Sequence, residues 1–182
     1  MAQKHHGAES VNTSVKGSQT VLAGCKHVLA SLLFVAAAVS IVAAAQADMI
    51  GVASVIDGDT IEIHGQRVRL HGIDAPEGGQ TCLDAAGRNW RCGQRAALAL
   101  QDLIGRRTVS CDERDVDRYG RVISRCLVGE IDINEWLVAQ GLALAYQRYS
   151  MDYLAAEDEA RAAGRGVWAG TFEPPWEWRH RR

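Results

Sequence analysis

Three short stretches of alternating apolar and polar side chains constrain the fold of this chain more than any other part of its sequence. They are residues 50–56 (IGVASVI), 60–64 (TIEIH) and 66–73 (QRVRLHGI). β-Branched residues in alternation, interrupted by glycine-containing turns, predict half-buried strands. The turn between the first two is Asp57-Gly58-Asp59, and Asp-Gly is typical of hairpins. The sequence therefore predicts a hairpin followed by a third strand.

The following residues add two strands and three helices. Apolar residues recur at helical spacing over 94–104, and two shorter helices are expected over 132–140 and 151–163, each stopped by a glycine. Strands are expected over 108–111 and 122–128, on either side of a polar turn. This order predicts an α+β fold that is mainly a β barrel. A five-stranded barrel of the oligonucleotide/oligosaccharide-binding (OB) type, with about three packed helices, fits it.

An uncharged apolar run precedes these elements. It covers residues 28–45, follows Lys26 and ends in Ala45-Gln46-Ala47. A basic flank, an apolar run and a small-x-small end are typical of a secretory signal peptide. We therefore expect residues 1–47 to be a signal peptide with a polar N-terminal extension, cleaved after Ala47, and the protein to be exported to the periplasm or secreted. The run could also just span a bilayer, so an uncleaved membrane anchor is the alternative.

The charges are unevenly distributed along the chain. Of 20 basic and 22 acidic residues, three lysines and one glutamate precede residue 48. The rest of the chain holds 17 arginines and 21 acidic residues, a net charge of −4. A protein that holds nucleic acid by bulk electrostatics is normally basic. Nucleic-acid binding by this chain would therefore need a few placed arginines and a metal ion.

Four cysteines follow the apolar run, at Cys82, Cys92, Cys111 and Cys126. An even number in an exported domain predicts disulfides. Of the three possible pairings, spacing favours Cys82–Cys92 and Cys111–Cys126. The second pair flanks the hairpin expected around residues 118–119, where its members would face each other within disulfide range. A zinc site is the competing interpretation, but the sequence lacks a close CxxC pair.

Two acidic turns follow predicted strands. Asp57 and Asp59 flank a glycine, and Asp74 and Glu77 bound the segment Asp-Ala-Pro-Glu. Each turn alone is typical of an ordinary strand connection. If the strands are neighbours, however, the acids could converge on one hard cation such as Ca²⁺, which prefers carboxylate, carbonyl and water oxygens.

Two arginines accompany these acids. Arg69 precedes Asp74 by five residues on the same strand, and Arg121 opens the strand after Tyr119-Gly120. An arginine fork can hold a phosphate through two hydrogen bonds. Either arginine alone is more often a surface residue. Beside acids that bind a metal, the two form a set suited to phosphodiester hydrolysis.

Three segments resemble the signature motifs of the thermonuclease (staphylococcal nuclease-like, SNase-like) family. They are V-I-D-G-D-T at 55–60, R-L-H-G-I-D-A-P-E at 69–77 and D-R-Y-G-R at 117–121. They occur in the family's order and at compatible separations, and the likeness covers about residues 50–170. The resemblance implies an SNase-like OB-fold nuclease domain over 48–170, followed by a Trp- and Arg-rich tail over 171–182.

The resemblance also implies a metal site. One Ca²⁺ ion would be bound by the carboxylates of Asp59 and Asp74 and by the backbone carbonyl of Ala75. The family often has threonine at this last position, and a carbonyl ligand tolerates the change to alanine. Asp57 and Thr60 would support the ligands without binding the ion.

The same resemblance assigns roles in catalysis and substrate binding. Arg69 and Arg121 would bind the scissile phosphate and stabilise the charge of its transition state. Glu77 would orient or deprotonate the attacking water. Tyr119 and Tyr146 would flank the nucleotide with their aromatic faces. A core tyrosine is the alternative for Tyr146.

The implied activity is that of a calcium-dependent endonuclease acting as a monomer on single-stranded or frayed DNA and on RNA, with 3′-phosphorylated products. A non-catalytic OB-fold module that binds nucleic acid or protein is the alternative, and a membrane-anchored structural protein is a weaker one. The complete set of acids and arginines argues against a degenerate site, and the net negative charge argues against a dedicated strand binder. His64 and His71 have no evident partner in the sequence and are expected to be structural or exposed.

Overall fold

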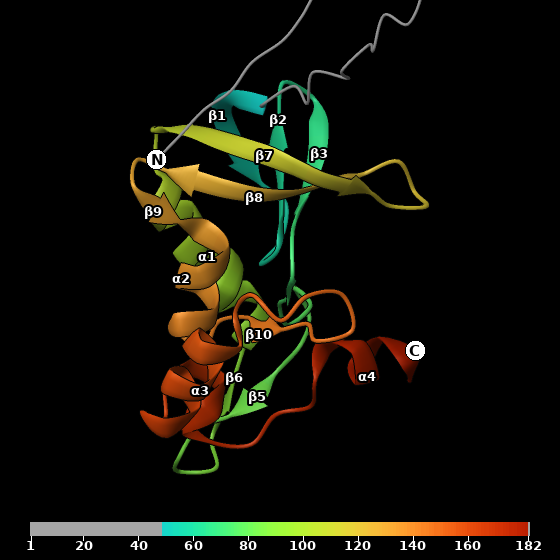
Figure 1. Cartoon of the computed structure of the whole chain (residues 1–182). Coiled ribbons are helices and arrows are strands. Elements are labelled where there is room, and N and C mark those ends of the chain that lie inside the picture. Colours follow the sequence, from blue (N-terminus) through green and yellow to red (C-terminus); the bar gives the residue numbers. More distant parts are fainter. Residues whose placement is uncertain (1–48, 182) are drawn as a thin grey trace, which may run out of the picture. The chain divides into compact units, whose positions relative to one another are not determined.

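A computed structural model describes residues 49–181; the expected signal peptide, its cleavage site and the alternative membrane anchor lie outside the described residues. Within 49–181, no helix combines the length and the apolar character needed to cross a bilayer. Five strands of this region form a barrel (Figure 1): β1 (Met49–Val55), β2 (Thr60–Ile63), β3 (Gln66–Leu70), β7 (Thr108–Val116) and β8 (Val122–Val128).

The barrel closes through a parallel pair of strands. Its strands follow the order β3-β2-β1-β7-β8, and β3 also pairs with β8. The closing pair is parallel, with Val68 opposite Val122, and the other neighbours are antiparallel. β8 pairs further with the short strand β9 (Ile131–Asp132). This closed five-stranded mixed barrel confirms the OB-type fold predicted from the order of elements.

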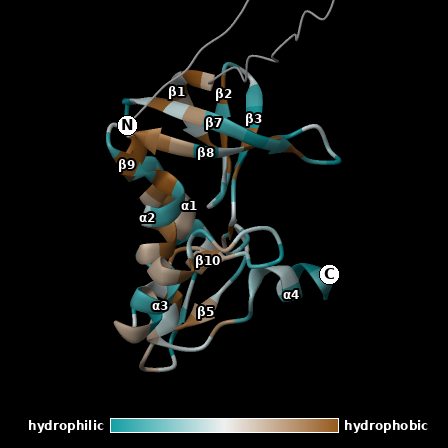
Figure 2. Cartoon of the chain, in the orientation of Figure 1, coloured by the Kyte–Doolittle hydropathy of each residue, from teal (hydrophilic) through white to brown (hydrophobic). Residues whose placement is uncertain are grey.

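The core lies where alternate strand residues point into the barrel. Ile61, Ile63, Val68 and Leu70 from two adjacent strands are almost completely buried. Burying such side chains supplies most of the favourable free energy of folding. Figure 2 shows the hydrophobic residues gathered on β1, β8, β9 and the helices, and hydrophilic residues along the last helix.

Residues 49–181 also contain four α-helices and one short 3₁₀-helix: α1 (Cys92–Ile104), α2 (Ile133–Ala139), α3 (Leu154–Ala162), η1 (Gly166–Ala169) and α4 (Pro175–His180). The first three occupy the predicted positions within a few residues. The face that α1 buries carries Ala96, Leu100 and Ile104, whereas Leu98 is about half exposed, at 47%. Apolar residues on two faces of α1 made the buried face ambiguous in the sequence.

Both predicted disulfides are present, so the cysteines do not form a zinc site. Cys82 and Cys92 have Cα atoms 5.7 Å apart and close the loop that holds a small hairpin of β5 (Cys82–Leu83) and β6 (Asn89–Trp90). Cys111 and Cys126 face each other in the β7–β8 ladder, with Cα atoms 4.1 Å apart. The second disulfide therefore joins two barrel strands in the core.

Asn134 fixes the corner of the chain between β3 and β4 (Ile73–Asp74). This buried side chain donates to the carbonyls of His71 and Ser124 and accepts a hydrogen bond from the backbone NH of Cys126. β4 in turn pairs with β10 (Leu144–Ala145), which lies far along the sequence. The corner that leads to Asp74 is thus held by three separate parts of the chain.

The start of α1 packs directly against the loop after β4. A Cβ atom on Gly93 would lie 1.7 Å from the carbonyl oxygen of Glu77, so only glycine fits there. Gly58 is packed in the same way, since a Cβ there would come within 3 Å of the side chains of Ala75 and Ala96. These close approaches bring the Asp57–Asp59 turn and the loop carrying Glu77 against the same helix.

Candidate active site

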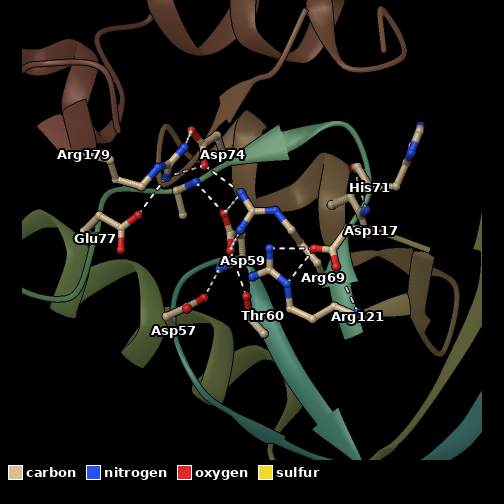
Figure 3. A network of polar contacts seen from close by, with 12 residues as sticks. Asp57, Asp59, Thr60, Arg69, His71, Asp74, Glu77, Asp117, Arg121 and Arg179 are labelled. Atoms are coloured by element: carbon tan, nitrogen blue, oxygen red, sulfur yellow. Dashed lines mark hydrogen bonds and ion pairs between the residues drawn. The ribbon is translucent and has the colours of Figure 1, made fainter. Parts of the chain in front are cut away.

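Three strand ends bring the predicted acids and one predicted arginine together. Asp59 immediately precedes β2, Arg69 lies on β3, and Asp74 lies on β4. β2 and β3 are paired with Thr60 opposite Arg69, and the Leu70 NH donates to the carbonyl of Asp59. Figure 3 shows these side chains pointing toward one another.

Arg69 bridges the two buried acids. Its Nη1 donates to Asp59 Oδ1 at 3.2 Å, and its Nη2 lies 3.0 Å from Asp59 Oδ2 and 2.8 Å from Asp74 Oδ1. The Asp74 side chain is fully buried, and that of Asp59 nearly so. Burial lowers the pKa of Arg69, but the two carboxylates outweigh this effect and leave it raised, so the guanidinium stays charged.

The carboxylate of Asp59 is oriented by its neighbours. Its Oδ2 accepts the backbone NH of Ala75 at 3.1 Å, and its Oδ1 accepts the hydroxyl of Thr60 at 3.0 Å. Asp57 supports the turn by accepting the backbone NH of Asp59. Asp57 and Thr60 therefore both contact Asp59.

Keeping Asp57 and Asp59 ionised costs free energy in this site. Burial first, and the neighbouring charge of Asp74 second, raise the pKa of Asp59 against the opposing effect of Arg69. Burial and the charge of Asp59 likewise raise the pKa of Asp57. A bound cation would relieve this cost, because it favours the charged form of both carboxylates.

Glu77 is held by a residue that sequence reasoning missed. The fully buried Gln80 accepts the backbone NH of Glu77 through Oε1, and its own NH donates to the carbonyl of Glu77. Its Nε2 donates to the carbonyl of Glu173 at 2.7 Å, which ties this loop to the C-terminal segment. A lone glutamine in a polar loop gives no signal of this role in the sequence.

A third arginine, also missed in the sequence, enters the site from α4. Arg179 Nη1 lies 3.0 Å from Asp74 Oδ1 and 2.7 Å from Glu77 Oε1, and its Nη2 lies 2.7 Å from Asp74 Oδ2. The hydrogen bonds to Asp74 raise the pKa of Arg179. Its position a hundred residues beyond these acids left no motif that could have identified it.

Arg121 lies at the start of β8, next to β3 in the closed barrel. Asp117 holds its guanidinium, with Nε 2.7 Å from Oδ2, and also accepts the backbone NH groups of Tyr119 and Arg121 through Oδ1. Tyr119 is exposed and lies against the guanidinium of Arg121. The D-R-Y-G-R segment thus builds a turn that carries the arginine and an open aromatic face.

Tyr146 has a stacking partner in the C-terminal helix. The ring of Trp176 lies parallel to it, with centroids 5.3 Å apart and an interplanar angle of 6°. Tyr146 is partly exposed, so it is not the buried core tyrosine of the alternative interpretation. His64 contacts the carbonyl of Ile50 and His71 contacts Asp152, so both make local structural contacts outside the acid cluster.

The donor set suits a hard divalent cation. Three carboxylates (Asp59, Asp74 and Glu77) pair with two guanidiniums (Arg69 and Arg179), and Asp57 lies beside Asp59, which leaves an excess of negative charge. Within residues 49–181 no three His, Cys, Asp or Glu side chains are grouped closely enough to hold a metal by themselves. An ion at Asp59 and Asp74 would therefore complete its shell with backbone and water oxygens, as Ca²⁺ commonly does.

Acids and arginines thus converge at the strand ends of a closed OB-type barrel. The sequence profile of the family described as "Staphylococcal nuclease homologue" matches residues 67–170. This match covers more than half of the chain, and the protein therefore belongs to the staphylococcal nuclease-like family. Asp57, Asp59 and Thr60 precede the matched residues, and α4 follows them.

Several curated proteins are similar to this chain in sequence. The chain is 41% identical over 99 residues to "Succinoglycan biosynthesis protein ExoI" of Rhizobium meliloti (strain 1021), covering 53% of this chain and 52% of the relative. It is 34% identical over 104 residues to an "Uncharacterized endonuclease" of Escherichia coli (55% and 68%) and 37% identical over 121 residues to a "Micrococcal nuclease" of Shigella flexneri (59% and 64%). The chain spans about half the length of the Rhizobium meliloti relative and of an "Uncharacterized endonuclease" of Haemophilus influenzae (strain ATCC 51907 / DSM 11121 / KW20 / Rd), to which it is 36% identical over 101 residues (53% and 56%).

Proposed function

We propose that this protein is a calcium-dependent nuclease that hydrolyses phosphodiester bonds of DNA and RNA and releases 3′-phosphorylated products. The observation that carries the proposal is the convergence of Asp59, Asp74 and Arg69 at the ends of adjacent strands, with Glu77 and Arg121 beside them. Relatives named as endonucleases support the same class of reaction.

The arginines bind and stabilise the phosphate. Hydrolysis of a phosphodiester places extra negative charge on the oxygens of the phosphorus atom in the transition state. Arg69 and Arg121 come from the paired strands β3 and β8 and can each present a fork of N–H donors to these oxygens. Asp117 fixes the orientation of Arg121 beforehand, so little reorganisation is needed when the substrate binds.

Glu77 handles the attacking water. Gln80 holds its backbone, and Figure 3 shows its carboxylate paired with Arg179, which also contacts Asp74. A carboxylate in this place can orient a water molecule or accept its proton. Asp59, Asp74 and Ala75 would hold Ca²⁺, which when bound supplies positive charge against the phosphate oxygens.

The substrate is a nucleic-acid strand whose bases are unpaired or can unpair from a duplex. Tyr119 presents an exposed ring on the β7–β8 turn, and Tyr146 presents a second ring from the segment after β10. Stacking on such rings is available to any base, which suits single-stranded or frayed DNA and RNA without sequence preference. One strand held by a few arginines is also compatible with the acidic composition.

Removing calcium is expected to abolish cleavage. Purified protein should degrade heat-denatured DNA in the presence of Ca²⁺ and lose this activity when a chelator is added, and renewed Ca²⁺ should restore it. The Asp74→Asn variant should show little Ca²⁺ stimulation, whereas Asp112→Asn, which changes an exposed acid on β7, should behave as the wild type. Cleavage that survives chelation would overturn the metal assignment, and no cleavage under any condition would favour the binding module.

We further propose that the protein is exported and acts as a monomer. The apolar run over 28–45 with its Ala-Gln-Ala end supports export. N-terminal sequencing of the protein recovered outside the cytoplasm should begin at Asp48, and light scattering should give the mass of one chain. Recovery of a chain that still begins before residue 28 would instead indicate a retained membrane anchor.

A further inference from the structure

The helix α4 covers the candidate site. It lies beyond the residues that match the family profile, and it has only six residues. Figure 1 shows it beside the loop after β4 and the segment that carries β10. Two of its side chains, Arg179 and Trp176, contact residues to which the proposed function gives a task.

Arg179 binds the carboxylate oxygens of Asp74, to which the proposed cation would bind. Its two Nη atoms contact both carboxylate oxygens of Asp74, and Arg69 shares one of these oxygens. Nη1 also reaches Glu77 at 2.7 Å. Since Asp74 is fully buried and all these contacts come from guanidinium groups, its carboxylate cannot accept a cation while Arg179 keeps this two-pronged contact.

Trp176 covers the aromatic face that a base would need. Its ring lies parallel to that of Tyr146 at stacking distance, and Tyr149 packs edge-on against the same tyrosine. A nucleobase stacked on this face of Tyr146 would occupy the position of the tryptophan ring. The helix α4 therefore blocks both the proposed metal ligand Asp74 and the proposed stacking residue Tyr146, through two independent contacts.

The helix is tied to the domain through the residues before it, and its contact with the acids is partly exposed to solvent. Residues before it are anchored by the Leu83–Thr171 bridge and by the hydrogen bond from Gln80 to the Glu173 carbonyl. Pro175 is buried at its start, but the side chain of Arg179 is 35% exposed. Its contacts with Asp74 and Glu77 are ion pairs, which water and salt weaken more readily than a packed core, whereas Trp176 also packs against the hydrophobic cluster of Cys82, Cys92, Leu144 and Val167.

We propose that α4 is an autoinhibitory latch that competes with Ca²⁺ and nucleotide for the same residues. Arg179 takes the place of the cation at Asp74, and Trp176 takes the place of a base at Tyr146. Calcium and nucleotide each compete with one contact of the helix, so binding of both favours its displacement more than binding of either. This inference rests on the proposed function, because the tasks of Asp74 and Tyr146 come from it.

Calcium affinity is the direct test. Isothermal titration of the full chain with CaCl₂ is expected to show roughly three- to tenfold tighter binding for Arg179→Ala than for the wild type, because the competing charge is gone. Arg179→Lys, which keeps a charge but not the fork, should fall between them. Arg181→Ala is the matched control: it removes an arginine that follows the same helix and pairs with Glu173, and its calcium affinity should be unchanged.

The stacking half of the latch has its own readout. Trp176→Ala should bind thymidine 5′-monophosphate more tightly than the wild type in the presence of Ca²⁺, because the face of Tyr146 is open. Circular dichroism melts of each variant show whether the domain remains folded. If one variant does not fold, the other still tests the latch, because the two contacts are separate.

The possible outcomes separate the latch from the proposed function. Equal or weaker calcium binding by folded Arg179→Ala would overturn the latch and make Arg179 a positioning residue for Asp74 and Glu77. A wild type and variants that all fail to bind Ca²⁺ would contradict the proposed metal site itself. Tighter binding in Arg179→Ala together with unchanged binding in Arg181→Ala would establish the competition.

Discussion

Arg69→Ala and Arg121→Ala should each lower kcat on denatured DNA by roughly 10²- to 10³-fold, the loss expected when a donor to a charged transition state is removed. The two arginines differ in their surroundings. Arg69 compensates the buried Asp59 and Asp74, so its loss should also destabilise the fold. Arg121 pairs with Asp117 in a partly exposed turn, so its loss should leave stability nearly unchanged.

The control for Arg69→Ala is an arginine on the same strand that has no proposed role in catalysis. Arg67 is exposed on β3, two residues before Arg69, and Arg67→Ala should keep wild-type turnover. Single-turnover cleavage and thermal melts measured together separate lost chemistry from lost folding. Near-wild-type turnover in both Arg69→Ala and Arg121→Ala would contradict the proposed mechanism.

The largest expected loss of stability follows from removing the Cys111–Cys126 disulfide. Replacing both cysteines with alanine should cost about 3 kcal/mol in the free energy of unfolding, because the closed loop no longer restricts the unfolded chain. Both residues are buried in the barrel core, so lost packing adds to this cost. For a domain of this size the melting temperature should fall by roughly 10 °C.

The other disulfide serves as the comparison. Removing Cys82–Cys92 should cost a similar amount of chain entropy, but its loop is flanked by Gln80 and Gly93, which both contact Glu77. We therefore expect that variant to lose more activity, relative to its loss of stability, than the Cys111/Cys126 variant. Thermal unfolding without reductant, and cleavage assays well below the transition, measure the two effects. A melting temperature unchanged in the Cys111/Cys126 variant would contradict the structural role of this bridge.

The barrel was predictable because its signals are local. Alternation over 50–73 and the turn at 117–121 depend on neighbouring residues. The structure contains this turn and the first two strands as expected, but the strand expected over 66–73 ends at Leu70, and the chain turns at residues 71–72 before β4, so Arg69 and Asp74 lie on different strands. The disulfide pairing across β7 and β8 followed from the same hairpin. The short strands β4 and β10 were not predicted, because two-residue strands have no periodicity and are formed by partners far apart in the sequence.

Some residues of the candidate site were predictable from local motifs, and others were not. Asp59, Arg69 and Asp74 lie in motifs close to one another in sequence, so their convergence followed once the strands were paired. Gln80 and Arg179 lie in segments with no pattern of their own. Their roles depend on side-chain contacts across the fold, which no local spacing encodes.

The amino-acid sequence by itself determined the barrel strands, the disulfide partners and the acids and arginines of the three motifs, because each is specified by alternation, turn chemistry or short motifs. Tertiary structure alone decided how these acids are compensated. Packing of α4 against the loop after β4 places Arg179 on Asp74 and Glu77 and Trp176 on Tyr146. The physical reason is that an ion pair or a ring stack between distant segments forms only after the chain has brought their backbones together.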